Sequence, residues 1–107
     1  MPAVLQQHTL ARPASFSGIG LHSGNKVAMT LLPSPPNTGV VFRRVDLESR
    51  VEIPAQIGNV AETDRSTSLS RGNAKVQTVE HVLAALYAFG VNNAVIEVDS
   101  SEPPVYR

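Results

Sequence analysis

The chain has 107 residues, no cysteine, and nine Lys+Arg against nine Asp+Glu. A chain of this length forms one domain at most. Its formal net charge of zero argues against non-specific nucleic-acid binding, which needs a basic surface. Without cysteine there is neither a disulfide nor a thiolate ligand for zinc, so any metal has to be held by imidazole and carboxylate groups.

The sequence also argues against membrane insertion and secretion. No apolar run approaches the roughly 18 residues that a membrane span requires. Residues 1–8 lack the basic stretch followed by an apolar stretch that marks a signal peptide. We therefore expect no membrane span and a cytoplasmic location.

The first half of the chain has the alternation of β-strands. Residues 7–17 alternate loosely and are predicted to form a strand that runs into a turn at residues 18–20. A reversal is expected at residues 24–25, because Gly and Asn favour turns. Residues 27–32 alternate as a strand, and residues 33–39 are predicted to be loop because their three prolines remove hydrogen-bond donors from a sheet.

Short strands are expected to follow this loop. Residues 40–45 are rich in β-branched and aromatic side chains. Residues 50–55 suit a short strand that Pro54 confines to a sheet edge. Residues 67–69 and 74–76 are compatible with a small hairpin.

The clearest element is a helix of about 12 residues that begins near residue 79. Thr78 is the predicted N-cap, and Gly90 suits the left-handed position that follows a last helical turn. Four apolar residues fall on one helical stripe: Val79, Val82, Leu83 and Leu86.

After the helix, residues 93–99 are predicted to form a strand, and residues 100–107 to be extended without a closing element. About six strands and one helix indicate the α+β class, with a layered sheet packed on a helix. One such helix covers only part of the sheet, so a second helix would be expected.

Glu80 and His81 stand side by side at the predicted helix start. An imidazole binds a metal ion and a nearby carboxylate takes a proton from water, which together permit hydrolysis. The sequence has neither H-E-x-x-H nor H-x-x-E-H, since Gln77 occupies the first position of the latter. A solvated glutamate beside a helix-start histidine is the alternative interpretation.

Three other places in the sequence carry side chains that could form a site. His22 lies among glycines, where it would either face a cleft or simply occupy a turn. The Gly-x-Gly there is not followed by a helix, so a nucleotide-binding loop is not supported. Arg43 and Arg44 favour a strand edge with a salt bridge over a phosphate clamp, and His8 is expected at the surface.

Five ordered segments resemble the N-terminal part of the UDP-3-O-acyl-N-acetylglucosamine deacetylases, zinc amidases of lipid A biosynthesis. The likeness covers roughly residues 8–105. The segments are residues 18–24 (GIGLHSG), 37–44 (NTGVVFRR), 65–69 (RSTSL), 78–86 (TVEHVLAAL) and 90–98 (GVNNAVIEV).

The resemblance implies roles for five residues and a cofactor, Zn²⁺. By motif, His81 matches a zinc ligand and Glu80 the general base that activates the zinc-bound water. His22 matches a histidine lining the approach to the active site. Asp64 and Arg65 fall in a loop whose backbone faces the substrate near the metal. The implied substrate is a nucleotide-sugar glycolipid precursor that loses its N-acetyl group.

The same resemblance implies a two-domain α+β sandwich of the ribosomal S5 domain 2-like type. Residues 1–107 would be its N-terminal domain, ending before its second helix. The remaining zinc ligands, a His and an Asp, and a further catalytic His would come from a second domain that this sequence lacks. The chain is therefore expected to be an inactive fragment when alone.

Two interpretations from other functional classes remain open. One is a non-catalytic α+β module that binds a partner or regulates the pathway. The other is an RNA-binding domain, since the half-fold is also used by ribosomal and RNA-processing proteins. The zero net charge and the absence of a basic stripe count against RNA.

Overall fold

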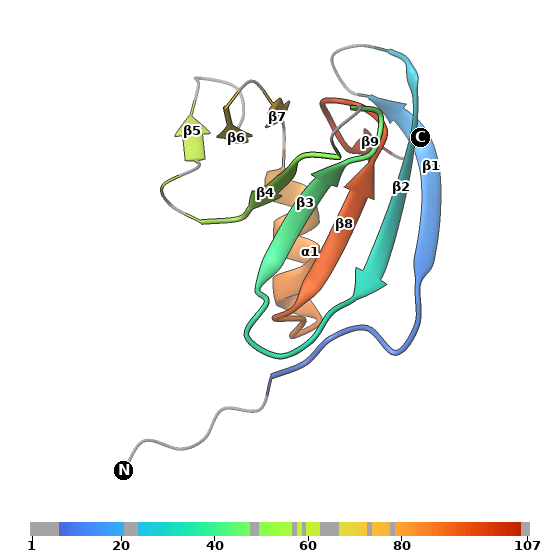
Figure 1. Cartoon of the computed structure of the whole chain (residues 1–107). Helices are drawn as coiled ribbons and strands as arrows, with labels where there is room; N and C mark the ends of the chain where they lie inside the picture. Colours follow the sequence, from blue (N-terminus) through green and yellow to red (C-terminus); the bar gives the residue numbers. More distant parts are fainter. Residues whose placement is uncertain are drawn as a thin grey trace.

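The computed structural model describes residues 7–20, 24–47, 50–56, 58, 60–62, 67–72, 74–77 and 79–105. These residues form two sheets and a single helix, so the predicted α+β class is confirmed. Figure 1 shows these elements in chain order, coloured from the first strand to the last. No helix in this described part is long and apolar enough to cross a membrane.

The main sheet has six strands in the order β4-β3-β8-β2-β1-β9. Its pairs are antiparallel except β3 and β8, which run parallel. A parallel pair needs a long crossover connection, and here that crossover contains the small sheet and the helix. The strands are β1 (Ala14–Gly20), β2 (Lys26–Pro33), β3 (Val40–Arg44), β4 (Glu52–Pro54), β8 (Ala94–Val98) and β9 (Pro104–Val105).

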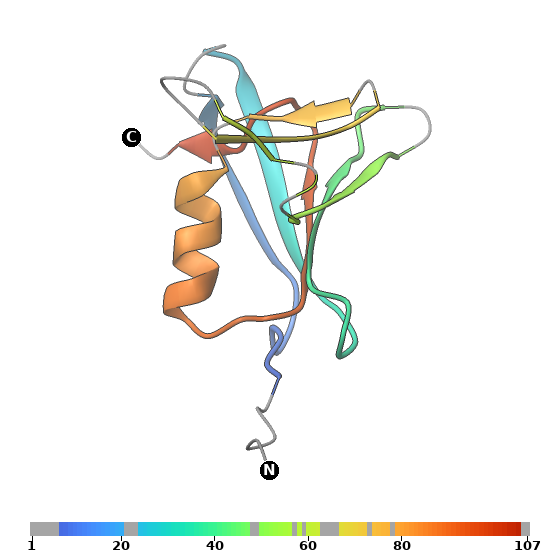
Figure 2. The same cartoon turned by 90° about the vertical axis from the view of Figure 1, so that its left-hand side faces the viewer.

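A second sheet of three short antiparallel strands lies at one end of the main sheet (Figure 2). Its strands are β5 (Val60–Glu62), β6 (Thr67–Arg71) and β7 (Ala74–Val76). The predicted hairpin is thus confirmed as β6 and β7, with Gly72 at a positive φ of 61° in the turn. Pro54 is likewise confirmed in an edge strand, β4.

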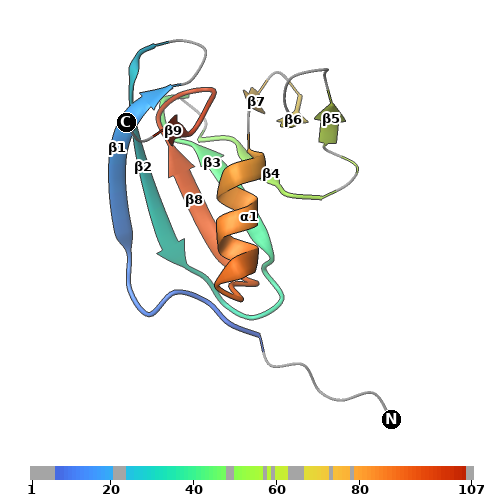
Figure 3. The ribbon, with the colours of Figure 1, turned by 180° about the vertical axis from the view of Figure 1, so that it is seen from behind.

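The helix α1 (Glu80–Ala88) packs on one face of the main sheet (Figure 3). Strand β8 directs Ala94, Ile96 and Val98 to this face, and all three are fully buried. The predicted helical stripe meets them: Val79, Val82 and Leu86 are buried, and Leu83 packs against the same core. Burial of apolar area along this stripe is what holds a nine-residue helix in place.

The two helix ends differ in how well the sequence predicted them. The N-cap position is Val79, which has no side-chain cap hydrogen bond. The predicted cap, Thr78, lies outside the described residues. At the other end Gly90 has φ +71°, and the N–H groups of Gly90 and Val91 donate to the Tyr87 and Leu86 carbonyls at 3.0 and 2.9 Å. This is a Schellman arrangement, so the prediction for Gly90 is confirmed.

Two predictions on local structure were wrong. Residues 18–20 were expected to turn, but β1 continues to Gly20, which pairs with Pro104 of β9 while Gly18 pairs with Val27 of β2. Residues 100–107 were expected to lack a closing element, yet β9 joins the edge of the main sheet. In both cases pairing between distant segments overrides local glycine and proline signals.

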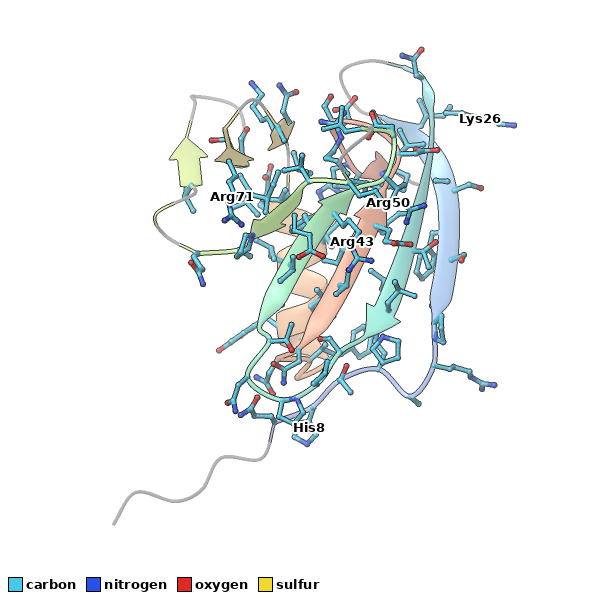
Figure 4. All side chains as sticks on the ribbon, viewed as in Figure 1. His8, Lys26, Arg43, Arg50 and Arg71 are labelled. Carbon is cyan, nitrogen blue, oxygen red and sulfur yellow. The ribbon has the colours of Figure 1, made fainter. Side chains whose placement is uncertain are left out.

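The face of the main sheet opposite α1 carries an ion-pair row (Figure 4). Arg43 donates to Glu52 at 2.8 Å and to Glu97 at 2.9 Å, joining β4, β3 and β8. Arg50 lies 3.9 Å from Glu97. The predicted salt bridge of Arg43 is therefore confirmed, but the predicted strand edge is wrong because β3 lies between β4 and β8. His8 is exposed as expected.

Arg44 links the two sheets. Its guanidinium donates to Asp46 through Nε and Nη2, at 2.8 and 2.6 Å, and through Nη1 to the Lys75 carbonyl of β7 at 2.8 Å. The hydrogen bonds from Arg44 lower the pKa of Asp46 below its ordinary value of 3.8. Ionised Asp46 therefore helps to orient the side chain that ties β3 to β7.

Leu86→Ala should lower the free energy of unfolding by about 2–5 kcal/mol, because it empties a core position of α1. Leu86 is 6% exposed, while its neighbour Tyr87 is 87% exposed. Tyr87→Ala is the matched control and should change stability by less than about 0.5 kcal/mol. Urea unfolding followed by circular dichroism measures both, and equal effects would contradict the described helix orientation.

Asp46→Asn should destabilise the protein at neutral pH and have no effect in strongly acidic buffer. Because the folded-state pKa of Asp46 is depressed, its contribution is present above the unfolded pKa and disappears as the pH falls through the folded pKa. Urea midpoints of both proteins across this acid range measure the difference. A difference that is independent of pH would show that the charge of Asp46 is not what matters.

Candidate functional site

The first turn of α1 presents Glu80 and His81 next to each other, and both side chains are exposed. The chain reaches this turn from β7 through Gln77, whose N–H donates to the Ser101 carbonyl at 2.6 Å. This bond joins the entry to α1 with the loop between β8 and β9. The helix start is therefore held from outside as well as by its own first intrahelical bond, from the Leu83 N–H to the Val79 carbonyl at 3.0 Å.

An apolar groove of about 340 Å³ runs between α1 and the inner face of β1 and β2. His81 lies at its lining, and it is the only residue there with an ionisable side chain among the described residues. Phe16 from β1 and Phe89 from the end of α1 are exposed at 38% and 85%. The groove is lined by Leu10, Phe16, Ser17, Met29, Leu31, His81, Val82, Ala85, Leu86, Phe89, Val91 and Pro104.

The groove exists because the apolar stripe of α1 covers only part of the sheet. Val82 and Leu86 belong to the buried core and also line the groove. One side of the helix is therefore packed on the sheet, while the adjacent side borders the groove. The prediction that one helix cannot cover the sheet is thus confirmed by this opening. The sequence did not reveal that Phe16 and Phe89 flank it, because they are far apart in the chain.

The chemistry available at this turn is one imidazole and one carboxylate. His81 offers a nitrogen ligand, and Glu80 offers a proton acceptor on the adjacent residue. Within the described ranges no group of three His, Cys, Asp or Glu residues is arranged to hold a metal ion. The donor set therefore fits a contribution to a metal site, with further ligands needed from elsewhere.

The other three candidate residues, His22, Asp64 and Arg65, lie outside the described residues. The structure does describe Gly20, two positions before His22 in the chain. Gly20 ends β1 and pairs with Pro104, and Pro104 lines the same groove as His81. The described end of β1 is therefore on the side of the molecule where α1 begins.

A buried acidic residue that the sequence did not single out lies in the same region. Glu102 is 2% exposed, and it directly follows Ser101, the acceptor of the Gln77 N–H. The surrounding Ser100, Ser101 and two prolines resemble an exposed loop in sequence. Nothing local signalled that this carboxylate is buried.

Comparison with known proteins finds one family and several close relatives. A family model described as UDP-3-O-acyl N-acetylglycosamine deacetylase matches residues 7–107. The chain is 52% identical over 102 residues to the UDP-3-O-acyl-N-acetylglucosamine deacetylase of Cellvibrio japonicus, covering 95% of this chain and 34% of that protein. The Pseudomonas entomophila protein of the same name is 50% identical over 102 residues, which are 95% of this chain and 34% of that protein.

A third relative, from Xanthomonas oryzae pv. oryzae, has the same name and is 53% identical over 100 residues. The match covers 94% of this chain and 33% of the relative. The chain thus spans about a third of the length of the curated relatives that it matches.

The isolated chain should bind Zn²⁺ only weakly, because a catalytic zinc site uses three protein ligands and the first turn of α1 supplies one. Competition with a chelating dye measures the affinity, and His81→Ala should remove what binding there is. His8→Ala, at an exposed position that does not line the groove, is the control. Tight stoichiometric zinc that depends on His81 would mean that the chain holds a complete site.

Proposed function

We propose that this chain, which belongs to the UDP-3-O-acyl-N-acetylglucosamine deacetylase family, provides the general base and one metal ligand of a deacetylase active site. The observation that carries the proposal is the pair Glu80 and His81 on the first turn of α1, with His81 at the lining of the groove. The substrate is the one in the relatives' names, a 3-O-acylated N-acetylglucosamine linked to UDP.

The reaction is hydrolysis of the N-acetyl amide. Water adds to the carbonyl carbon, the C–N bond breaks, and acetate and the free amine leave. Glu80 takes a proton from the attacking water, and the leaving amide nitrogen gains a proton as the C–N bond breaks. His81 would hold the metal. A bound Zn²⁺ supplies polarisation of the carbonyl oxygen and a lower pKa for its water.

The remaining ligands belong to the part of the enzyme that this sequence does not represent. A carboxylate and a further imidazole from a second domain complete the three protein ligands that catalytic zinc requires. This division is consistent with the absence of a metal-binding group of three among the described residues, and with the chain's match to a third of its relatives. The activity serves lipid A biosynthesis in the cytoplasm.

A chimera tests the proposal and separates the two residues by role. Residues 8–105 of this chain replace the matching segment of the Cellvibrio japonicus deacetylase, with which they share about half of their sequence. His81→Ala should remove metal and activity together, because it removes a ligand. Glu80→Gln should keep zinc and lose roughly 10²–10⁴-fold in rate, the usual contribution of a positioned general base.

Acetate release and zinc content are measured on the same samples, with Glu52→Gln on the opposite sheet face as the control. A Glu80→Gln chimera with an intact rate would make this glutamate a structural residue. A wild-type chimera that folds and binds its substrate without any acetate release would favour the non-catalytic binding module.

A further inference from the structure

The segment before β1 is fastened to the rest of the protein mainly by hydrogen bonds. Residues 7–9 are exposed, yet each of them is bonded to a segment that is distant in the sequence. Figure 3 shows this segment, at the blue end of the described chain, passing the end of α1 and the start of β8. Residues 7–10 thus form a strap across this end of the protein.

The strap pairs with the connector that leads from α1 into β8. The His8 N–H donates to Asn92 Oδ1 at 2.9 Å, and the His8 carbonyl accepts the N–H groups of Asn92 and Asn93 at 2.9 and 3.1 Å. Thr9 Oγ1 donates to the Asn93 carbonyl at 2.6 Å. Because Val91 directly precedes these residues and lines the groove, the strap holds the chain at the exit of α1.

The strap also holds the loop between β2 and β3. Gln7 Nε2 donates to Asn37 Oδ1, and Gln7 Oε1 accepts the Asn37 N–H, both at 2.7 Å. Asn37 has a φ of +67°, a left-handed conformation that asparagine adopts more readily than most residues. Thr9 Oγ1 accepts the Ser34 N–H at 3.0 Å. The strap therefore bridges two connections that are far apart in the sequence.

Asn93 joins the strap to the parallel strands β3 and β8. It is 3% exposed, and its Oδ1 accepts the Gly39 N–H at 2.8 Å while its Nδ2 donates to Gln7 Oε1 at 2.9 Å. A buried amide is unfavourable when its hydrogen bonds are missing. Gln7 therefore supplies a partner that Asn93 would otherwise have to take from water.

Leu10, the last residue of the strap, lines the groove. Strand β1 reaches the side where α1 begins with its last residue, Gly20, which pairs with Pro104. Leu10 precedes β1 and follows the residues that are bonded to the exit of α1. It therefore lies toward the opposite end of the groove, where Phe89 also contributes to the lining. The strap is thus the wall of the groove at the end away from His81.

We propose that the strap is a movable closure of the groove. When it is fastened, it closes the end beside Phe89, and when it is released, it opens that end while the sheet and α1 stay folded. Exposed segments with few buried apolar contacts open at a lower free energy than the core does. Residues 7–9 are exposed, whereas Ala94 and Ile96 of β8 are fully buried. The proposal does not depend on the roles of Glu80 and His81.

Gln7→Ala combined with Thr9→Val tests the strap in the 107-residue chain. Both positions are exposed, and the changes remove the side-chain hydrogen bonds of the strap. The amides of Asn92 and Asn93 should exchange at least about tenfold faster, a factor that corresponds to about 1.4 kcal/mol, while the amides of β8 keep their protection. His8→Ala is the matched control, because His8 joins the connector through backbone groups, and it should leave these rates unchanged.

The fluorescence of the apolar dye anilinonaphthalene sulfonate measures access to the groove. It should increase in the double variant but not in His8→Ala, and adding Phe89→Ala should reduce the increase because Phe89 lines the opened end. Unchanged exchange of Asn92 and Asn93 would overturn the proposal, as would faster exchange without a gain in dye fluorescence. Should the double variant fail to fold, Gln7→Ala alone decides by the same two readouts.

Discussion

The packing of α1 on the inner face of the main sheet is the constraint on which the rest of the structure depends. Ile96, Phe42 and Ile53 from three adjacent strands form a surface with no exposure to solvent, and the helix closes it with its own apolar stripe. A helix of nine residues is too short to be stable in water without such packing. The core therefore fixes the position of the helix, and with it the position of the residues on its first turn.

The packing of α1 also fixes the backbone of Glu80 and His81, because these residues directly follow Val79, which is fully buried. The core holds the helix axis, the Schellman end at Gly90 fixes its last turn, and the bond from Gln77 to Ser101 fixes its entry. In the roles that we propose for them, a proton acceptor and a metal ligand need to be held within about 0.5 Å of their working geometry. Residues on the start of a packed helix meet that demand better than residues on a free loop.

The sequence predicted the elements whose evidence is local. The stripe from Val79 to Leu86, the left-handed Gly90 and the edge position of Pro54 each follow from neighbouring residues, and each is confirmed. It failed where distant segments pair, as between Gly20 and Pro104. Glycine and proline are poor strand residues by local preference, so β9 and the end of β1 become visible only once both strands are placed beside each other.

The same limit applies to the site. The pair Glu80 and His81 was recognisable because its two members are adjacent in sequence, but the groove beside it combines residues from opposite ends of the chain, from Leu10 to Pro104. The burial of Glu102 was missed for a different reason: a glutamate between serines and prolines signals solvent exposure, yet Glu102 is 2% exposed in the loop that leads into β9. The strand that the sequence did not predict also brings Pro104 to the lining of the groove that His81 lines, so the pairing of β9 with β1 shapes the surroundings of the candidate site.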